Sequence, residues 1–325
     1  MSVPSRSETL DDLYTSTWNN RLKTVTDQIF DASPTFALLK KKGSIRFNGT
    51  GGRYLEIPLS YAKNETCISL GKGDTISLSE TAFLTVAQFE WKFAGCTIVR
   101  YWTDDAKNKS VQQHLSWINQ KIDNARNSMT DYFEQKLFGD GTGNSGKDID
   151  GLGNLVSTTP TAAATVGNIA QATYSYWQNR QKTATGAASV YLLADMRNLA
   201  NTASEGITRD YCDLIVTTQT VAELFDDEVL EQRQIVNLGA NDPEGKGQNA
   251  WKGIPLTWSA QCASGRMYML NSQYLTLEID PEYNFQMTEW KSIPNQVLDK
   301  VCHIVWKGNC VSSRRKSLGV LTSVA

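Results

Sequence analysis

The feature that most limits the fold of this chain is one very long amphipathic helix. Segment 104–138 begins with Thr103-Asp104-Asp105, a cap followed by acidic first-turn residues, and ends at Gly139. Its apolar residues are spaced alternately four and three apart, which places them on one narrow face. They are Val111, Leu115, Ile118, Ile122, Ala125, Met129, Tyr132, Phe133 and Leu137. At about 1.5 Å per residue this helix is roughly 50 Å long. We expect a single helix lying along a sheet, because Ala125 and the lack of flanking heptads disfavour a coiled coil.

Upstream, two alternating segments predict a long two-stranded ribbon. Apolar and polar side chains alternate in 53–61 and again in 87–93, so each segment predicts a strand with one buried face. Between them lies the polar stretch Lys63–Thr81, which contains Gly71-Lys72-Gly73-Asp74. Two interpretations stay open: an ordinary sheet with a long loop, or a functional excursion that needs another surface to pack against.

The other segments predict an α+β fold with a mixed sheet. Residues 1–42 read as an extended arm with one or two short helices and too few apolar positions for a core of its own. Helices are expected at 168–181 and 221–230, and short buried strands at 189–194 and 213–216. Strands then dominate, at Ile254–Ser259, Arg266–Leu270, Leu275–Ile279, Cys302–Trp306 and Ser317–Val324.

Composition lowers the expectation for several function classes. The chain has 32 Lys and Arg against 34 Asp and Glu, a net charge of −2, whereas a dedicated reader of duplex DNA normally carries a basic face. No window approaches the length of apolar sequence that crosses a bilayer, and the N-terminus lacks an apolar export segment. Six scattered cysteines are typical of free thiols in a reducing cytoplasm. Only two histidines are present, His114 and His303, which disfavours an enzyme.

The glycine loop after the long helix is the segment that most resembles a known binding motif. Gly141–Gly146 matches G-x-G-x-x-G, and Lys147 completes most of a P-loop, but Asp148 stands where Ser or Thr should bind magnesium. Both motifs need a strand before the loop and a helix after it, because the helix N-terminus holds the phosphate. Here a long helix precedes the loop and a glycine-rich stretch follows it. We predict a surface turn, at which replacing Lys147 or Asp148 with Ala costs little.

Two sets of candidate metal ligands also lack the required spacing. The candidates in the loop are Asp140, Asn144, Asp148 and Asp150. They fail the EF-hand pattern, which needs Gly at its sixth position and Glu at its twelfth. Cys302-His303 with Cys310 resembles half a zinc site, but adjacent residues of a strand point to opposite faces. We therefore predict no catalytic residue, no cofactor-binding residue, no metal ligand and no cofactor.

Two basic clusters, Lys40–Lys42 and Arg314–Lys316, have several interpretations. Either cluster could touch the phosphates of packaged nucleic acid through a sequence-blind electrostatic attraction. Equally, these side chains could be solvated, or could pair with acidic residues of a neighbouring subunit.

The order of these parts resembles the major capsid proteins of tailed bacteriophages, whose fold is shared with herpesvirus shells and encapsulins. Short strings support this resemblance: Phe138-Gly139-Asp140-Gly141, Asp150-Gly151-Leu152, Asp213–Thr217, Gly308–Val311 with Arg314-Arg315, and Gly319-Val320-Leu321. The resemblance implies the following parts. They are an N-terminal arm at 1–42, an extended loop (E-loop) at 43–95, a peripheral (P) domain at 96–155 and 280–325 with its spine helix at 104–138, and an axial (A) domain at 156–279.

The resemblance implies a structural protein rather than an enzyme. Such proteins self-assemble into hexamers and pentamers of an icosahedral shell that encloses a double-stranded DNA genome. The expected location is the virion, after synthesis in the bacterial cytoplasm. The expected partners are other copies, a portal, scaffolding or decoration proteins, and packaged DNA without sequence preference, but no membrane.

Some properties of the family are not expected here. Since the arm starts at Met1, assembly is expected to use a separate scaffolding protein or none. Lys63 and Lys72 lie in the extended loop, yet no Asn or Glu can be matched to them, so we do not expect isopeptide cross-links. The alternatives are an encapsulin-like compartment and, from another class, a soluble α/β enzyme with an unrecognised site.

Overall fold

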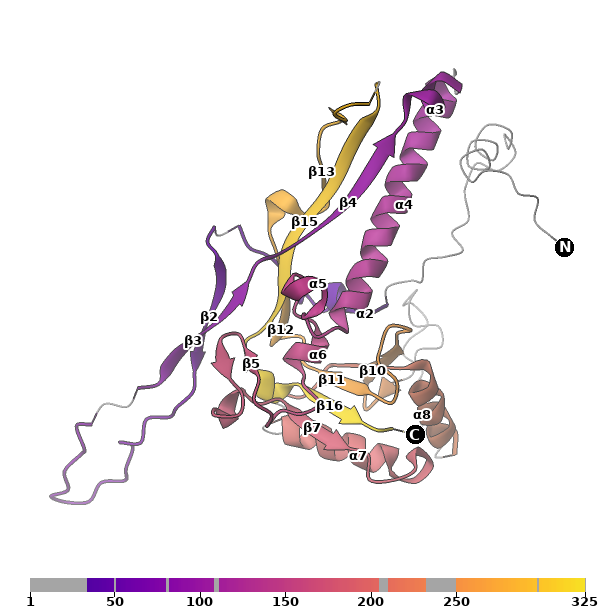
Figure 1. Ribbon diagram of the computed structural model, residues 1–325. Helices are drawn as coiled ribbons and strands as arrows, with labels where there is room; N and C mark the ends of the chain where they lie inside the picture. Colours follow the sequence, from indigo (N-terminus) through magenta and orange to yellow (C-terminus); the bar gives the residue numbers. More distant parts are fainter. Residues whose placement is uncertain are drawn as a thin grey trace. The chain divides into compact units, whose positions relative to one another are not determined.

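The computed structural model covers most of the chain. Its residues divide into two units. The described residues are 34–49, 51–79, 82–107, 111–204, 210–231, 250–296 and 298–324. Their first unit comprises Phe93–Phe133 and Asp280–Lys307, and their second comprises Pro34–Lys92, Glu134–Ile279 and Gly308–Ala325. Residues 1–33, most of the predicted arm, lie outside the described residues. Helices and strands are mixed along the chain (Figure 1), so the α+β prediction is confirmed.

The first unit is built on one long helix and one long strand. Helix α4 spans Val111–Leu137, and the short helix α3 (Trp102–Lys107) precedes it. Within this unit, three strands pair with β15 (Lys300–Ser312), whose last residues belong to the second unit. They are β4 (Lys92–Arg100), β13 (Gln286–Met287) and β14 (Lys291–Ser292), and the 3-10 helix η2 (Pro281–Tyr283) lies just before β13 in the chain.

The predicted apolar stripe of the long helix is confirmed from Ile118 onward, whereas the side chains of Val111 and Leu115 lie outside the part of the chain that the structure describes. Ala125, Met129 and Phe133 are buried, and the rings of Phe133 and Trp306 have their centroids 4.4 Å apart. Ile122 is half-buried, whereas Tyr132 is exposed and lies off the stripe. The helix therefore buries one narrow face within the unit, as the spacing of its apolar residues requires.

The second unit contains a mixed sheet in the order β7-β16-β11-β8-β10-β9. Its strands are β7 (Arg180–Thr183), β16 (Gly319–Thr322), β11 (Met267–Leu270), β8 (Leu214–Thr217), β10 (Ile254–Trp258) and β9 (Ala250–Trp251). β8 runs parallel to β10 and β16 parallel to β7, while β11 runs antiparallel to both of its neighbours. Helices α7 (Ala188–Ala203) and α8 (Gln219–Glu231) share one hydrophobic core with the sheet.

The second unit also contains shorter elements outside that sheet. β1 (Ile45–Phe47) pairs parallel with β12 (Leu275–Ile279), which runs antiparallel to residues 308–312 of β15. The others are α2 (Pro34–Lys41), β2 (Tyr54–Ser60), β3 (Leu84–Glu90), α5 (Gly143–Gly146), α6 (Leu152–Leu155), β5 (Thr165–Val166), β6 (Ile169–Ala170), η1 (Ser175–Trp177) and η3 (Arg315–Ser317).

Two predicted elements are wrong. The strand expected at 189–194 is the first half of α7, in which Leu192, Met196 and Leu199 are buried at helical spacing. A run of four apolar residues fits either structure, and only the residues beyond it decide. The helix expected at 168–181 is instead β6, the single turn η1 and β7. Gly167 and Asn168 have φ angles of 58° and 62°, so they form the two-residue turn of the β5–β6 hairpin, for which positive φ at both positions is typical.

The buried carboxyl group of Glu134 links α4 to Ser259, the residue that follows β10. Its Oε1 accepts a hydrogen bond of 3.0 Å from Ser259. Burial raises the pKa of Glu134, and hydrogen bonding with Ser259, Thr35 and Phe36 offsets only part of that increase. The folded chain therefore binds this proton more tightly than the unfolded chain does.

This raised pKa predicts a pH-dependent effect of Glu134→Gln. The stability contributed by protonated Glu134 is fully present below its ordinary pKa and is lost as the pH rises through its folded pKa. Relative to the wild type, the free energy of unfolding of Glu134→Gln should increase from about pH 4 to about pH 8. Urea titrations across this range measure it, with the exposed Glu289→Gln as a control. A pH-independent difference for Glu134→Gln would show that this carboxyl group is not perturbed by folding.

Candidate functional site

The two predicted ribbon strands form a separate hairpin within the second unit. β2 and β3 pair antiparallel from Tyr54 opposite Glu90 to Ser60 opposite Leu84 (Figure 1). The buried side chains of the ribbon are Leu55, Leu59, Ala87 and Phe89. These positions are the apolar ones of the two alternating segments, so the sequence pattern sets which face of each strand is buried.

The base of the ribbon packs on the β5–β6 hairpin. The Gln88 amide donates a hydrogen bond of 2.9 Å to the Gly167 carbonyl, and the Asn168 amide group donates to the Gln88 side chain at 3.2 Å. A Cβ atom at Gly167 would lie 2.9 Å from the Phe89 ring, which explains why glycine is needed there. The ring of Tyr61 stacks on that of Tyr176 at 5.2 Å. The base of the ribbon is thus anchored by the protomer itself.

Beyond the base, the connecting segment exposes a set of large apolar side chains. None of the described residues in 61–79 and 82–83 is buried. The exposed apolar residues are Ile68, Leu70, Ile76, Leu78, Phe83 and Leu84, with Leu78 98% exposed. Single exposed apolar residues are normal, but a set of six on one exposed segment favours an interaction surface. We call these six residues the apolar tip.

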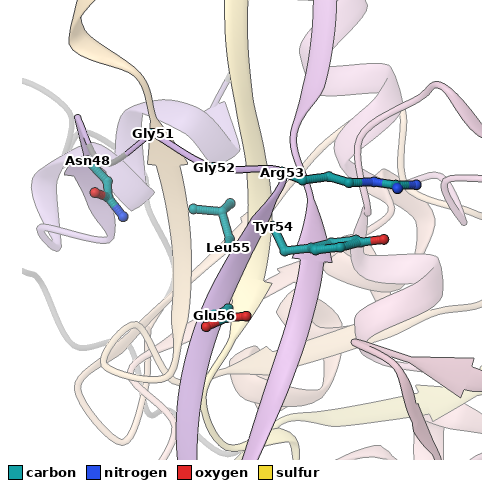
Figure 2. Close-up of a pocket in the computed structure, with 7 residues that line it drawn as sticks. All are labelled: Asn48, Gly51, Gly52, Arg53, Tyr54, Leu55 and Glu56. Atoms are coloured by element: carbon teal, nitrogen blue, oxygen red, sulfur yellow. The ribbon is translucent and has the colours of Figure 1, made fainter.

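A shallow pocket of about 430 Å³ lies at the start of β2. Figure 2 shows Arg53 and Tyr54 pointing to one side of the ribbon and Asn48 at the other end of the pocket. The Arg53 guanidinium lies 5.1 Å from the Tyr54 ring centre and 3.7 Å from the Glu90 carboxylate. The residues lining the pocket include no histidine, cysteine or serine.

The glycine loop has the geometry of a turn rather than a phosphate cradle. Asn144 and Ser145 adopt left-handed conformations, with φ angles of 51° and 59°, inside the short element α5. Asp140 caps this turn: its carboxylate accepts hydrogen bonds from the amide and the hydroxyl of Thr142, which lower the pKa of Asp140. The loop follows a helix, whereas a phosphate-binding loop follows a strand.

The three loop carboxylates have different partners. Asp148 lies 2.8 Å from the Lys136 amine, and Asp150 accepts hydrogen bonds from the side chains of Asn154 and Asn309. Among the described residues, no three His, Cys, Asp or Glu side chains are grouped to hold a metal ion. Each carboxylate instead fixes a different part of the loop.

The interpretation of Asp148 as a surface residue is wrong. Its side chain is only 5% exposed, because the ion pair with Lys136 holds it beneath the turn. Asp148→Ala should therefore lower the free energy of unfolding by about 2 kcal/mol, since it leaves a partly buried lysine without this partner. Lys147→Ala, at an exposed position, should change it by no more than about 0.5 kcal/mol. If chemical denaturation shows the same loss of unfolding free energy for both variants, the ion pair between Asp148 and Lys136 does not stabilise the protein.

Two residues of the second basic cluster have partners within the protomer. Arg314 forms an ion pair with Asp210 at 2.6 Å, and Arg315 is fully buried. The Arg315 guanidinium donates five hydrogen bonds, all to neutral oxygens. They reach the carbonyls of Leu155 (2.8 Å), Trp177 (3.0 Å) and Asn154 (3.3 Å) and the side chains of Gln171 (3.1 Å) and Asn179 (3.3 Å). Burial lowers the pKa of Arg315 to about 10, so the group stays charged at neutral pH. Lys40–Lys42, in contrast, lie at exposed positions, and of these the Lys42 amine lies 3.9 Å from the Asp213 carboxylate.

The cysteine and histidine side chains on β15 point in different directions. Cys302 is buried and the adjacent His303 is exposed, where its ring lies 3.0 Å from the Thr97 hydroxyl. This is the opposite-face arrangement expected for neighbouring strand residues. Cys310 is also buried, and burial raises its pKa to about 12, which leaves it an unreactive thiol at neutral pH.

No protein-family model matches the sequence, and no curated protein is detectably similar to it. Solved structures do match. The cyanophage A-1(L) capsid subunit aligns with a TM-score of 0.68 at 14% identity, over 95% of this chain and 97% of that one. The capsid of Myoviridae phage XM1 aligns at 0.57 and 11% identity, over 93% and 96%. The SrpI encapsulin from Synechococcus elongatus PCC 7942 aligns at 0.57 and 10% identity, over 100% and 96%.

These matches cover nearly the whole of each chain. The chain therefore has the fold of the major capsid proteins of tailed bacteriophages, which the encapsulin shares. The predicted resemblance is confirmed at the level of the fold. Within the described residues, no helix is long and apolar enough to cross a membrane.

Proposed function

We propose that this chain is a major capsid protein that self-assembles into the hexamers and pentamers of an icosahedral shell around a double-stranded DNA phage genome. The observation that carries the proposal is the apolar tip, whose six large side chains the protomer exposes. The fold of the chain is that of shell subunits, in which a neighbouring copy can cover them. Burying one large apolar side chain fully gains about 1.5–3 kcal/mol. The tip thus has a strong tendency to pack on another surface, and a neighbouring copy supplies one.

The proposed parts follow the predicted boundaries. Residues 1–42 form the arm, 43–95 the E-loop, 96–155 with 280–325 the P domain, and 156–279 the A domain. The arm and the E-loop lie on neighbouring subunits, in obligate interfaces that commonly bury about 2,000 Å² or more. A net charge of only −2 limits repulsion between many copies.

The proposed role needs contacts rather than catalysis. The protein is made in the bacterial cytoplasm and acts in the virion. Its partners are other copies, a portal, scaffolding or decoration proteins, and packaged DNA without sequence preference. The exposed side chains of Lys40–Lys42 are candidates for that last contact.

A single substitution at the tip tests the proposal. Leu78→Asp places a charge where an apolar contact is proposed, so it should abolish particle formation while leaving the melting temperature of the protomer unchanged, since Leu78 is 98% exposed. Ser77→Asp, next to it and also exposed, should assemble. If Leu78→Asp forms normal particles, Leu78 is not part of an interface between subunits.

The second candidate is the shell of an encapsulin-like compartment, because the SrpI encapsulin aligns over the whole of this chain. The cargo separates the two. Particles purified from their natural source and treated with nuclease should contain protected double-stranded DNA if the chain is a capsid protein. Particles that hold a protein cargo and no DNA would favour the compartment.

A further inference from the structure

A buried polar cluster holds the ribbon at the point where β3 ends. Asn309, in β15, is fully buried. Its Nδ2 donates to the Glu90 carbonyl at 2.8 Å and to the Asp150 carboxylate at 2.7 Å. Its Oδ1 accepts from the backbone amides of Asp150 at 2.9 Å and Cys310 at 2.8 Å. The carboxamide therefore uses both of its donors and both lone pairs. We call this the Asn309 cluster.

A second contact fixes the chain two residues further on. The amine of Lys92 donates a hydrogen bond of 2.6 Å to the Gly146 carbonyl and lies 3.9 Å from the Glu90 carboxylate. The Lys92 side chain is only 13% exposed. Gly146 has a φ of 78° and ends the left-handed turn of the glycine loop. Residues 90–92 are thus tied to both ends of that loop, through Gly146 and, by way of Asn309, through Asp150.

We propose that Asn309 and Lys92 are positioning residues that set the direction in which the ribbon leaves its unit, so that the apolar tip reaches its place on a neighbouring subunit. This inference rests on the proposed function. The geometry explains why direction matters. Strands β2 and β3 have seven residues each, and seven residues extend over about 20 Å. A rotation of about 15° at the base moves the far end by about 5 Å, which is enough to break a side-chain contact.

The chemistry of the cluster favours a directional role over simple packing. An apolar side chain of the same size could fill the position of Asn309, but it would not fix the angle between the end of β3 and the loop. Four hydrogen bonds from one rigid carboxamide do fix that angle, and a fully satisfied buried network specifies a single arrangement.

A side-chain swap separates positioning from general stability. Asn309→Asp removes both donors and sets a second carboxylate against Asp150. Adding Asp150→Asn restores a hydrogen bond between the two side chains, because the new amide group at position 150 can donate to the carboxylate at position 309. That carboxylate also still accepts the hydrogen bond from the backbone amide of residue 150. The Glu90 carbonyl still lacks its donor in the double variant. The swap therefore restores the hydrogen bond between positions 150 and 309 but not the one that holds the end of β3.

The unassembled protomers of the wild type, the single variant and the double variant are compared by thermal melting and by hydrogen exchange of residues 54–60 and 84–90. The single variant should melt at a lower temperature. The double variant should regain most of the lost melting temperature, yet its ribbon amides should exchange about tenfold faster than those of the wild type, and its particles should vary in size under the electron microscope. Wild-type ribbon exchange and uniform particles from the double variant would overturn the proposal.

A second pair keeps the test decisive if the double variant melts early. Lys92→Met should accelerate ribbon exchange, whereas Lys92→Arg keeps a donor and should match the wild type. Identical exchange in both would overturn the role of Lys92. Because exchange is measured on protomers, these results stand even if the wild type forms no shell, an outcome that would count against the proposed function instead.

Discussion

Replacing residues 62–82 with a two-residue Asn-Gly turn should leave a folded protomer that cannot assemble. The Tyr61 amide already donates a 3.0 Å hydrogen bond to the Phe83 carbonyl, so a tight turn can close the hairpin at this point. No described residue in the replaced segment is buried, and its removal therefore takes nothing from the core. The melting temperature should stay within about 2 °C of the wild type, and particles should be absent.

The matched control replaces only Gly71–Asp74 with four serines, which changes the polar turn but keeps the apolar side chains on both sides of it. This variant should assemble. Sedimentation velocity measures both variants. Closed particles from the shortened ribbon would mean that the apolar tip is not needed for assembly, and a large fall in melting temperature would mean that the segment packs on its own protomer.

Arg315→Ala should lower the free energy of unfolding by about 4 kcal/mol. The substitution removes all five hydrogen bonds of the guanidinium and leaves buried oxygens of Leu155, Trp177 and Gln171 without a donor. It also opens a cavity beside the Trp177 ring, whose centre lies 5.8 Å from the guanidinium carbon. Arg315→Lys should recover little of this free energy, because a single amine cannot reach all the acceptors that surround the planar guanidinium group.

Arg197→Ala, at an exposed position on α7, is the control and should change the free energy by no more than about 0.5 kcal/mol. Urea denaturation of the three variants measures these differences. A loss below about 1 kcal/mol for Arg315→Ala would show that Arg315 is a surface residue, as a nucleic-acid contact requires.

The elements that the sequence predicts well are those with sustained periodicity. The long helix repeats its apolar spacing over many turns, and the ribbon strands alternate over their whole length, so local pattern alone sets the buried face. The strands expected at 254–259, 266–270 and 275–279 are likewise found as β10, β11 and β12. In contrast, the apolar run at 190–193 is too short to separate helix from strand.

The polar residues that organise the fold could not be identified from the sequence, because their partners lie far along the chain. Arg315 lies beside two other basic residues, as surface arginines often do, yet it donates hydrogen bonds to residues as distant in the sequence as Asn154. Asp148 looks like a loop residue, and nothing local points to Lys136. Asn309 lies in a short string that resembles capsid sequences, and nothing near it in the chain indicates that it joins Glu90 to Asp150. The domain boundaries remain predictions.

The central claim, that this chain builds a closed shell, is tested most directly by negative-stain electron microscopy of the purified protein. The exposed apolar tip and the capsid fold predict hollow isometric particles of uniform diameter that form without any other phage protein or with a scaffolding protein added. A monomer or a small closed oligomer under both conditions, at every concentration tested, would contradict the claim.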